Sequence, residues 1–234
     1  MHKSRLSSLI GSTLLIFSSY FVLQAADKQL SSSATHLKPL LLKMGPSIIS
    51  ETFDKDSTRV QSWAKYGTQW QVIDGAFVGS PASLDYQKAH PGKHSGTTPR
   101  LQAKIPLCKD GLIIKFDFKS EKKIGRAAFW LGHHHFKLLI SDNQPSLQYT
   151  KDKKNIITTA LKPINGPMKE NQWYSVIMET HGTHRVVQIS GFEPLIVEAF
   201  ALVKTSPVRM SGSKGEQFQF DNFHFIEGAG LLKP

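Results

Sequence analysis

The sequence contains a single cysteine, Cys108, in 234 residues. One cysteine cannot form an intramolecular disulfide, so the folded chain must be stabilised by its hydrophobic core. No histidine is adjacent to Cys108, which lies between Pro106-Leu107 and an apolar segment that begins at Leu112. Catalytic cysteines are commonly activated by a neighbouring histidine. We therefore interpret Cys108 as a small apolar residue and not as a nucleophile.

The motifs of the common hydrolases are also missing. The chain has no Gly-x-Ser-x-Gly nucleophile elbow, and Ser211-Gly212-Ser213 has the composition of a turn. It has no Glu-x-Asp-x-x-Glu strand motif, although glycoside hydrolysis uses two carboxylates about 5–10 Å apart. Glu179 is the strongest single carboxylate on an expected strand. Its candidate partners, which also fit solvent-facing or turn-forming roles, are Glu51, Asp117, Asp221 and Glu198.

Only one stretch has the pattern of an export or membrane segment, and it lies at the N-terminus. Lys3 and Arg5 precede an apolar run over residues 14–23, and Ala25-Ala26 follow as a cleavage point. The run is short and two serines interrupt it, which favours a cleaved signal peptide over residues 1–26 against an uncleaved anchor helix. The sequence thus predicts an exported protein, periplasmic or extracellular, with no integral membrane segment after cleavage.

Acidic residues are fewer than basic ones, 18 against 29, which gives a formal net charge of +11. Removal of Lys3 and Arg5 with the signal peptide leaves +9. Such a charge favours anionic partners, such as an acidic polysaccharide, a cell-wall polymer or an acidic membrane surface. The basic residues are scattered and form no concentrated motif, so the sequence predicts no nucleic-acid partner.

Long helical patterns are nearly absent, and short β-type runs alternate with turn signals instead. We expect a linker over residues 27–49, in which a short helix that ends at Gly45-Pro46 is an alternative. A β-domain over residues 50–228 and a tail over residues 229–234 would follow. The expected strands are 70–73, 76–79, 101–105, 112–118, 127–131, 134–141, 146–149, 174–180, 185–190, 195–200 and 217–226. Asp74-Gly75 predicts a tight hairpin.

Aromatic and acidic residues gather at both ends of the expected domain. The closing segment from Phe218 to Phe225 alternates apolar and polar side chains, which is typical of a strand with one buried face. A strand so close to the C-terminus needs a neighbour, and the segment around Phe53 is the most economical one. We therefore expect the two ends of the domain to pair.

Four segments carry a resemblance to a known family: Phe53-Asp54, Trp63 with Trp70 to Gly75, Trp173-Tyr174-Ser175-Val176 with Gly182, and Phe220-Asp221-Asn222-Phe223. Over most of residues 50–227, the chain resembles the concanavalin A-like jelly-roll domains of the 3-keto-disaccharide hydrolase family. The resemblance implies an all-β sandwich of two curved antiparallel sheets, in which a concave face meets carbohydrate. Such domains are common in exported proteins of planctomycete-type bacteria.

A narrower resemblance, to short single-domain relatives, rests on two motifs. His90-Pro91 precedes Arg100, and Gly132 and His134 precede Lys137. The relatives have an arginine-like residue where this chain has Lys137, and a lysine lacks the planar two-pronged contact of an arginine. The resemblance implies a site in which His134 and His90 are catalytic, with a histidine as general base. Arg100 and Lys137 would then contact the substrate.

Three consecutive histidines extend this candidate site. Period two puts His133 and His135 on the strand face of Lys137, and His134 on the opposite face. Exposed tryptophan rings stack on sugars, and Trp130 lies close to the histidines in sequence. We therefore expect His133, His135, Lys137 and Trp130 to bind substrate.

Metal chemistry has weaker support. Two histidines on one face are fewer than the three protein ligands of a catalytic zinc. Oxygen atoms of Asp221 and Asn222 could hold a structural calcium near Phe53-Asp54, but the six or more ligands that calcium needs cannot be assembled from the sequence. We expect no cofactor, with a structural calcium as the alternative.

Two kinds of function remain open from the sequence. The first is an enzyme that hydrolyses a carbohydrate, in particular a 3-keto-glycoside. The second is a non-catalytic module of the cell envelope that binds glycans or has a structural or protein-interaction role. In both cases the expected partner is a carbohydrate or glycoside, with an anionic one favoured by the charge.

Overall fold

The computed structural model describes residues 37–232, except 55–57, 93–94, 106–107, 132–135, 153–154 and 202–205. The expected signal peptide lies outside the described residues and stays a prediction. Residues 34–234 belong to one compact unit. No helix among the described residues is long and apolar enough to cross a membrane.

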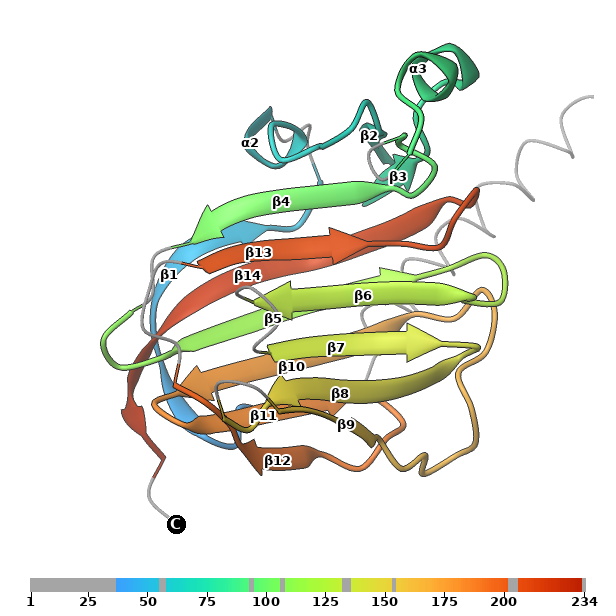
Figure 1. The fold of residues 1–234 in the computed structure, drawn as a ribbon. Helices are drawn as coiled ribbons and strands as arrows, with labels where there is room; N and C mark the ends of the chain where they lie inside the picture. The colour runs from blue at the N-terminus through green and yellow to red at the C-terminus, as the bar shows by residue number, and fades with distance from the viewer. Residues whose placement is uncertain are drawn as a thin grey trace, which may run out of the picture. The chain divides into compact units, whose positions relative to one another are not determined.

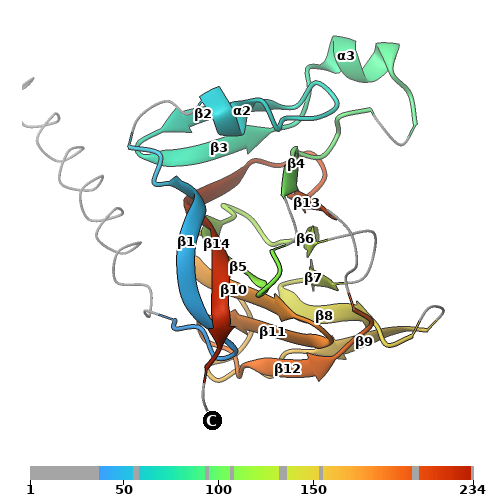
Figure 2. The same cartoon turned by 90° about the vertical axis from the view of Figure 1, so that its left-hand side faces the viewer.

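The described chain is an all-β sandwich of two antiparallel sheets, as the sequence predicts (Figure 1). The eight-stranded sheet has the order β12 (Leu195–Glu198), β11 (His184–Ile189), β10 (Tyr174–His181), β5 (Leu112–Lys119), β14 (Phe218–Leu231), β3 (Ala76–Ser80) and β2 (Gln69–Ile73), and β1 (Leu42–Glu51) pairs with β14. The six-stranded sheet has the order β4 (Arg100–Ile105), β13 (Ser206–Ser211), β6 (Arg126–Leu131), β7 (Phe136–Ser141), β8 (Gln144–Thr150) and β9 (Ile156–Ala160). Figure 2 shows these six strands one below another, from β4 to β9.

Within the described residues, two short helices precede the six-stranded sheet in the chain. They are α2 (Thr58–Gln61) and α3 (Leu84–Ala89). Ser83 caps the N-terminus of α3, where its hydroxyl accepts a hydrogen bond from the Tyr86 amide at 3.2 Å. Asp74 and Gly75 both have positive φ, 51° and 75°, in the turn between β2 and β3, which confirms the predicted hairpin.

Phenylalanine rings fill the space between the sheets. The Phe116 ring of β5 lies 4.8 Å from the Phe129 ring of β6, so the contact joins the two sheets. On β14, the Phe218 and Phe220 rings pack into the same cluster, with centroids 5.2 Å apart. Because all four side chains are at most 1% exposed, this cluster forms the centre of the core.

A β-bulge interrupts the alternation of β14. The pairing with β5 shifts register between Asp221 and His224, and Asn222 has a φ of 50°. The extra residue lets Phe220 and Phe223 both face the core although they are three positions apart. The bulge explains why two polar residues stand side by side in a strand that otherwise alternates.

The two ends of the domain pair as predicted. Strand β1 lies antiparallel to β14, with Ile49 opposite Phe225 and Glu51 opposite Phe223. Just beyond β1, the buried Phe53 ring stacks on Phe77 at 4.9 Å and meets the edge of Phe223 at 6.3 Å.

Strand β1 extends across the domain boundary expected at residue 50. Residues 42–51 form β1, so the described part of the expected linker, with its alternative of a short helix, is mostly strand. The Gly45-Pro46 pair does not end the element, because β1 pairs with β14 through register shifts on either side of it. The sequence prediction also missed β9 and β13, which are short and mix apolar with polar residues.

Candidate functional site

The outer face of the six-stranded sheet carries an alternation of large and small side chains. In β6, Ala127, Phe129 and Leu131 face the core, so Arg126, Ala128 and Trp130 face outward. In β7, the same alternation turns Lys137 and Leu139 outward.

Strand pairing brings these outward residues together with two from distant parts of the chain. Trp130 lies opposite Lys137, and Ala128 lies opposite Leu139. On the other side of β6, Ala128 faces Ser211 of β13, which in turn faces Arg100 of β4. Side chains that are directly opposite in neighbouring strands have Cβ atoms about 4.5–5.5 Å apart. Arg100 and Leu139 are therefore separated by two small residues.

This arrangement produces a hollow, because short side chains form its floor and long ones form its rim. We call it the basic hollow. Its volume is about 290 Å³, close to the lower end of the ~300–1,000 Å³ typical of small-molecule sites. The described residues that line it are Thr98, Arg100, Arg126, Ala128, Trp130, Lys137, Leu139, Ser211, Gly212 and Lys214.

The electrostatics of the basic hollow come from cations alone in its described lining. Arg100, Arg126, Lys137 and Lys214 line it, and none of its described lining residues is acidic. Burial lowers the pKa of Lys137, and the positive charge of Arg126 lowers it further. The lowered pKa of Lys137 thus has two causes, the partial burial of its ammonium group and one nearby cation.

Two N–H groups of the basic hollow are buried without a hydrogen-bond partner. They are Arg100 Nε and Trp130 Nε1. The Arg100 guanidinium lies over the Tyr66 ring, 5.2 Å from its centroid, which restricts its movement. Because a buried donor without an acceptor costs about 1–3 kcal/mol, a ligand oxygen that reached either group would recover part of that cost.

The structure brings together three of the seven site residues expected from the sequence: Arg100, Trp130 and Lys137. His133, His134 and His135 lie outside the described residues, in the segment that joins β6 to β7. These three histidines stay predictions.

His90 is not among the residues that line the basic hollow. It ends α3, where its Nδ1 lies 3.0 Å from the Tyr86 carbonyl oxygen and its ring stacks on the Tyr86 ring at 4.0 Å. The His90-Pro91 motif thus has a local role in ending the helix.

The sequence analysis missed Arg126 and Lys214. Arg126 could have been found, because period two from Trp130 through Ala128 leads directly to it. Lys214 lies in the loop between β13 and β14 and reaches the basic hollow only through the pairing of β13 with β4 and β6. No local pattern signals that position.

The candidate carboxylates lie on the other sheet. Glu179 of β10 is fully buried and accepts hydrogen bonds from the amides of Leu40, Leu41 and Leu42 at 2.8, 3.0 and 2.9 Å. It therefore anchors the segment that leads into β1. No pair of carboxylates lines the described part of the basic hollow, as hydrolysis by two carboxylates would need.

Asp117 and Asp221 lie directly opposite each other on β5 and β14. Asn222 joins them: its amide N–H donates to Asp221 Oδ1 at 2.7 Å, and its side-chain Nδ2 donates to Asp117 Oδ2 at 2.7 Å. The two aspartates thus hold the β14 bulge. Among the described residues, no group of three or more histidine, cysteine, aspartate or glutamate side chains is placed to bind a metal.

The pH dependence of stability tests the structural role of the buried Asp117. Burial raises its pKa, against the opposing effects of hydrogen bonds from Ser175 and Asn222. The folded protein therefore binds the proton more tightly than the unfolded chain, and wild-type stability falls as pH rises from the ordinary aspartate range through the raised pKa. Asp117→Asn keeps an oxygen to accept from Asn222 but carries no charge. We expect the variant to gain stability relative to wild type across this pH window, as measured by urea unfolding between pH 3 and 7.

The matched control for Asp117→Asn is Asp142→Asn, because the Asp142 side chain is 75% exposed. We expect little difference from wild type for this control. A loss of stability in Asp117→Asn that grows with pH would contradict the interpretation.

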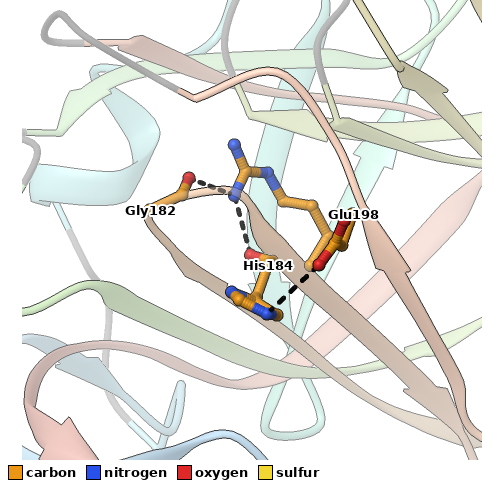
Figure 3. Close-up of polar contacts among 4 residues, drawn as sticks. Gly182, His184 and Glu198 are labelled. Carbon is orange, nitrogen blue, oxygen red and sulfur yellow. Dashed lines mark hydrogen bonds and ion pairs between the residues drawn. The ribbon is translucent and has the colours of Figure 1, made fainter.

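A second polar cluster, at the turn between β10 and β11, is structural. Figure 3 shows Gly182, His184 and Glu198 at this turn. Arg185, which is fully buried, lies between β10 and β12 on β11. Arg185 donates to the carbonyl oxygens of Gly182, His184 and Phe200 at 2.7–2.8 Å, and burial lowers its pKa to about 10. His184 lies 3.8 Å from Glu198 on the neighbouring strand. Three carbonyl groups therefore hold the two terminal nitrogens of the guanidinium, whereas Nε is buried without a hydrogen-bond partner.

Cys108 is half-buried, and burial raises the pKa of its thiol, with a further rise from Glu227. A raised pKa disfavours the thiolate that nucleophilic catalysis requires. This supports the interpretation of Cys108 as a structural residue.

No protein-family model and no curated protein matches the chain. Solved structures match it at low sequence identity. The binding domain of botulinum neurotoxin DC in complex with SialylT shares 12% identity at a TM-score of 0.52, over 80% of this chain and 48% of that one. A structure of botulinum neurotoxin type C, whose cell entry depends on two ganglioside molecules, shares 11% identity at a TM-score of 0.52, over 80% and 48%. The chain thus spans about half the length of these neurotoxin domains.

A further match covers nearly all of the other protein. The conserved carbohydrate esterase of the Shiga toxin-encoding bacteriophage phi24B shares 11% identity at a TM-score of 0.51, over 79% of this chain and 99% of that one. Identities this low support a shared fold. The chain is therefore a jelly-roll β-sandwich of the concanavalin A-like type, similar in fold to botulinum toxin binding domains and to a phage carbohydrate esterase.

Proposed function

We propose that this sandwich is an exported carbohydrate-binding domain whose site is the basic hollow. The observation that carries the proposal is the meeting of Trp130, Arg100 and Lys137 at one recess of an open sheet face. An aromatic ring beside several hydrogen-bond donors suits a sugar, which has apolar ring faces and polar edges. The similarity in fold to a carbohydrate esterase and to a neurotoxin that interacts with gangliosides adds support.

Folding alone does not explain the residues of the basic hollow. The outer face of a sheet needs only polar or small residues to remain in water. A half-buried tryptophan next to four cations costs stability through charge repulsion and a buried N–H without a partner. Such a costly arrangement is typical of binding sites.

Alanine substitution in the basic hollow tests the proposal. A glycan array with the purified protein would first identify a ligand, and calorimetry would then measure its affinity. We expect Trp130→Ala and Lys137→Ala to weaken binding at least about tenfold, which corresponds to ~1.4 kcal/mol each. Loss of ring stacking explains the first effect, and loss of a charged donor explains the second.

The control for these variants is Lys104→Ala. Lys104 is exposed and lies on the outer face of β4, as Arg100 does, but it does not line the basic hollow. We expect its affinity to equal that of wild type. Unchanged binding in both Trp130→Ala and Lys137→Ala, with all three proteins folded, would move the site elsewhere.

A second candidate function is the hydrolysis of a 3-keto-glycoside, with His134 and His90 as the catalytic groups. The resemblance of the sequence to 3-keto-disaccharide hydrolases supports it, and so does the position of His134 in the segment between β6 and β7, two strands that line the basic hollow. An enzyme should release sugar from a 3-keto-glycoside, and His134→Ala should abolish release without loss of binding. Binding of sugars without any turnover would leave the carbohydrate-binding domain as the function.

A further inference from the structure

The charges of the basic hollow restrict the chemistry of its ligand. None of Arg100, Arg126, Lys137 and Lys214 forms an ion pair with a carboxylate of the described residues. Elsewhere on the surface, two lysines do have carboxylate partners, at 3.1 and 3.8 Å. The cations of the basic hollow are therefore left without compensation by the described part of the chain.

The arrangement of the strands forces these cations together. Lys137 lies opposite Trp130, and Arg126 precedes Trp130 by four residues on the same face of β6. Arg100 reaches the same recess from β4, across Ser211. Repulsion between like charges is unfavourable; the pKa of Lys137 is lowered first by its burial and then by the charge of Arg126. An anion in the recess would remove this repulsion.

Apart from the hydroxyl groups of Thr98 and Ser211, the hydrogen-bonding side chains of the lining are donors only. Guanidinium, ammonium and indole groups donate and do not accept, and two of these donors, Arg100 Nε and Trp130 Nε1, are buried without a hydrogen-bond partner. Carboxylate and sulfate oxygens accept without donating, so they match this set better than hydroxyl groups do. The contact of Arg100 with Tyr66 fixes the guanidinium before any ligand arrives, which reduces the entropy lost on binding.

On the basis of the proposed function, we infer that the basic hollow selects sugars that carry an oxyanion group, either the carboxylate of a uronic acid or a sulfate ester. The ring of the sugar would lie against Trp130, and its oxyanion would meet the cations of β4, β6 and β7. The volume of about 290 Å³ suits one charged unit of a glycan.

Matched oligosaccharides test the inference. Neutral glucose, galactose and mannose oligomers would be compared with their uronic acid counterparts and with their 6-sulfated counterparts, by calorimetry at low and high salt. We expect at least one acidic series to bind about tenfold or more tightly than its neutral counterpart at low salt, with most of this preference lost at 1 M salt. Preference for the carboxylate or for the sulfate series identifies the source of the oxyanion.

A pair of double variants separates a specific site from the overall positive charge. Arg126→Gln with Lys137→Gln removes two charges from the basic hollow, whereas Lys88→Gln with Lys104→Gln removes two exposed charges elsewhere. We expect only the Arg126→Gln, Lys137→Gln double variant to abolish the preference for acidic sugars. Equal losses of this preference in the two double variants would attribute binding to net charge and overturn the inference.

The remaining outcomes distinguish the two proposals. If neutral and acidic sugars bind equally and Trp130→Ala weakens both, the inference about the oxyanion fails while the carbohydrate site stands. If no sugar of any series binds, both fail.

Discussion

Replacing Glu179 should give one of the largest losses of stability of any single substitution in this protein. The fully buried carboxylate accepts three backbone N–H groups, from Leu40, Leu41 and Leu42. Glu179→Gln keeps the shape but turns an N–H donor toward at least one of these amides. We expect it to lower the free energy of unfolding by about 2 kcal/mol, and Glu179→Ala to lower it by about 4 kcal/mol. Urea unfolding monitored by tryptophan fluorescence measures both.

Replacing Glu179 should also loosen the segment over residues 40–42. Leu42 packs with Ile113, Ile177 and Ile226 in a small cluster on the outer face of the eight-stranded sheet. In Glu179→Gln, the amides of residues 40–42 should exchange hydrogen faster, because their acceptor is weakened. Glu198→Gln is the control, since the Glu198 side chain is 81% exposed. Equal stabilities for Glu179→Ala and Glu198→Gln would show that residues 40–42 need no such anchor.

Gly79→Ala should produce a loss of similar size by a steric route. Gly79 of β3 lies directly opposite Trp70, and a Cβ atom there would be only 2.3–2.5 Å from three carbons of the indole ring. The ring cannot move aside freely, because it stacks on Phe77 at 5.0 Å and on Phe220 at 5.8 Å. We expect a loss of about 3 kcal/mol in the free energy of unfolding.

A glycine in open space provides the control for Gly79→Ala. A Cβ atom at Gly125 would meet nothing within 4 Å, and Gly125 does not have a positive φ. Gly125→Ala should therefore be neutral or slightly stabilising, because alanine reduces the entropy of the unfolded chain. If both variants unfold at the same urea concentration, the close contact of Trp70 with Gly79 does not contribute to the free energy of unfolding.

The candidate site shows which kinds of residue can be found from a sequence. Trp130 was predicted as an aromatic residue close to the three histidines, and Lys137 through a resemblance and through its place on the same strand face as His133 and His135; both line the basic hollow. Arg100 was identified through a resemblance, and the structure places it at the rim of the same hollow. The two small floor residues, Ala128 and Ser211, gave no signal because small residues on a sheet face are common.

The carboxylates show the opposite case. Glu179 and Asp221 are acidic residues on strands, as catalytic carboxylates of a sandwich would be. Both carboxylates, however, accept hydrogen bonds from backbone amides. Only the three-dimensional position distinguishes a carboxylate that faces a ligand from one that holds the chain. A count of acidic residues on expected strands cannot separate them.

The sequence by itself determined the β-sandwich and the direction of most side chains, because the alternation of apolar and polar residues depends only on near neighbours in the chain. The tertiary structure decided which strands lie side by side. It inserted β13, which the sequence did not predict, between β4 and β6, and so brought Arg100 to within two strands of Trp130. Pairing between segments this far apart depends on the packing of the whole core, which no local pattern encodes.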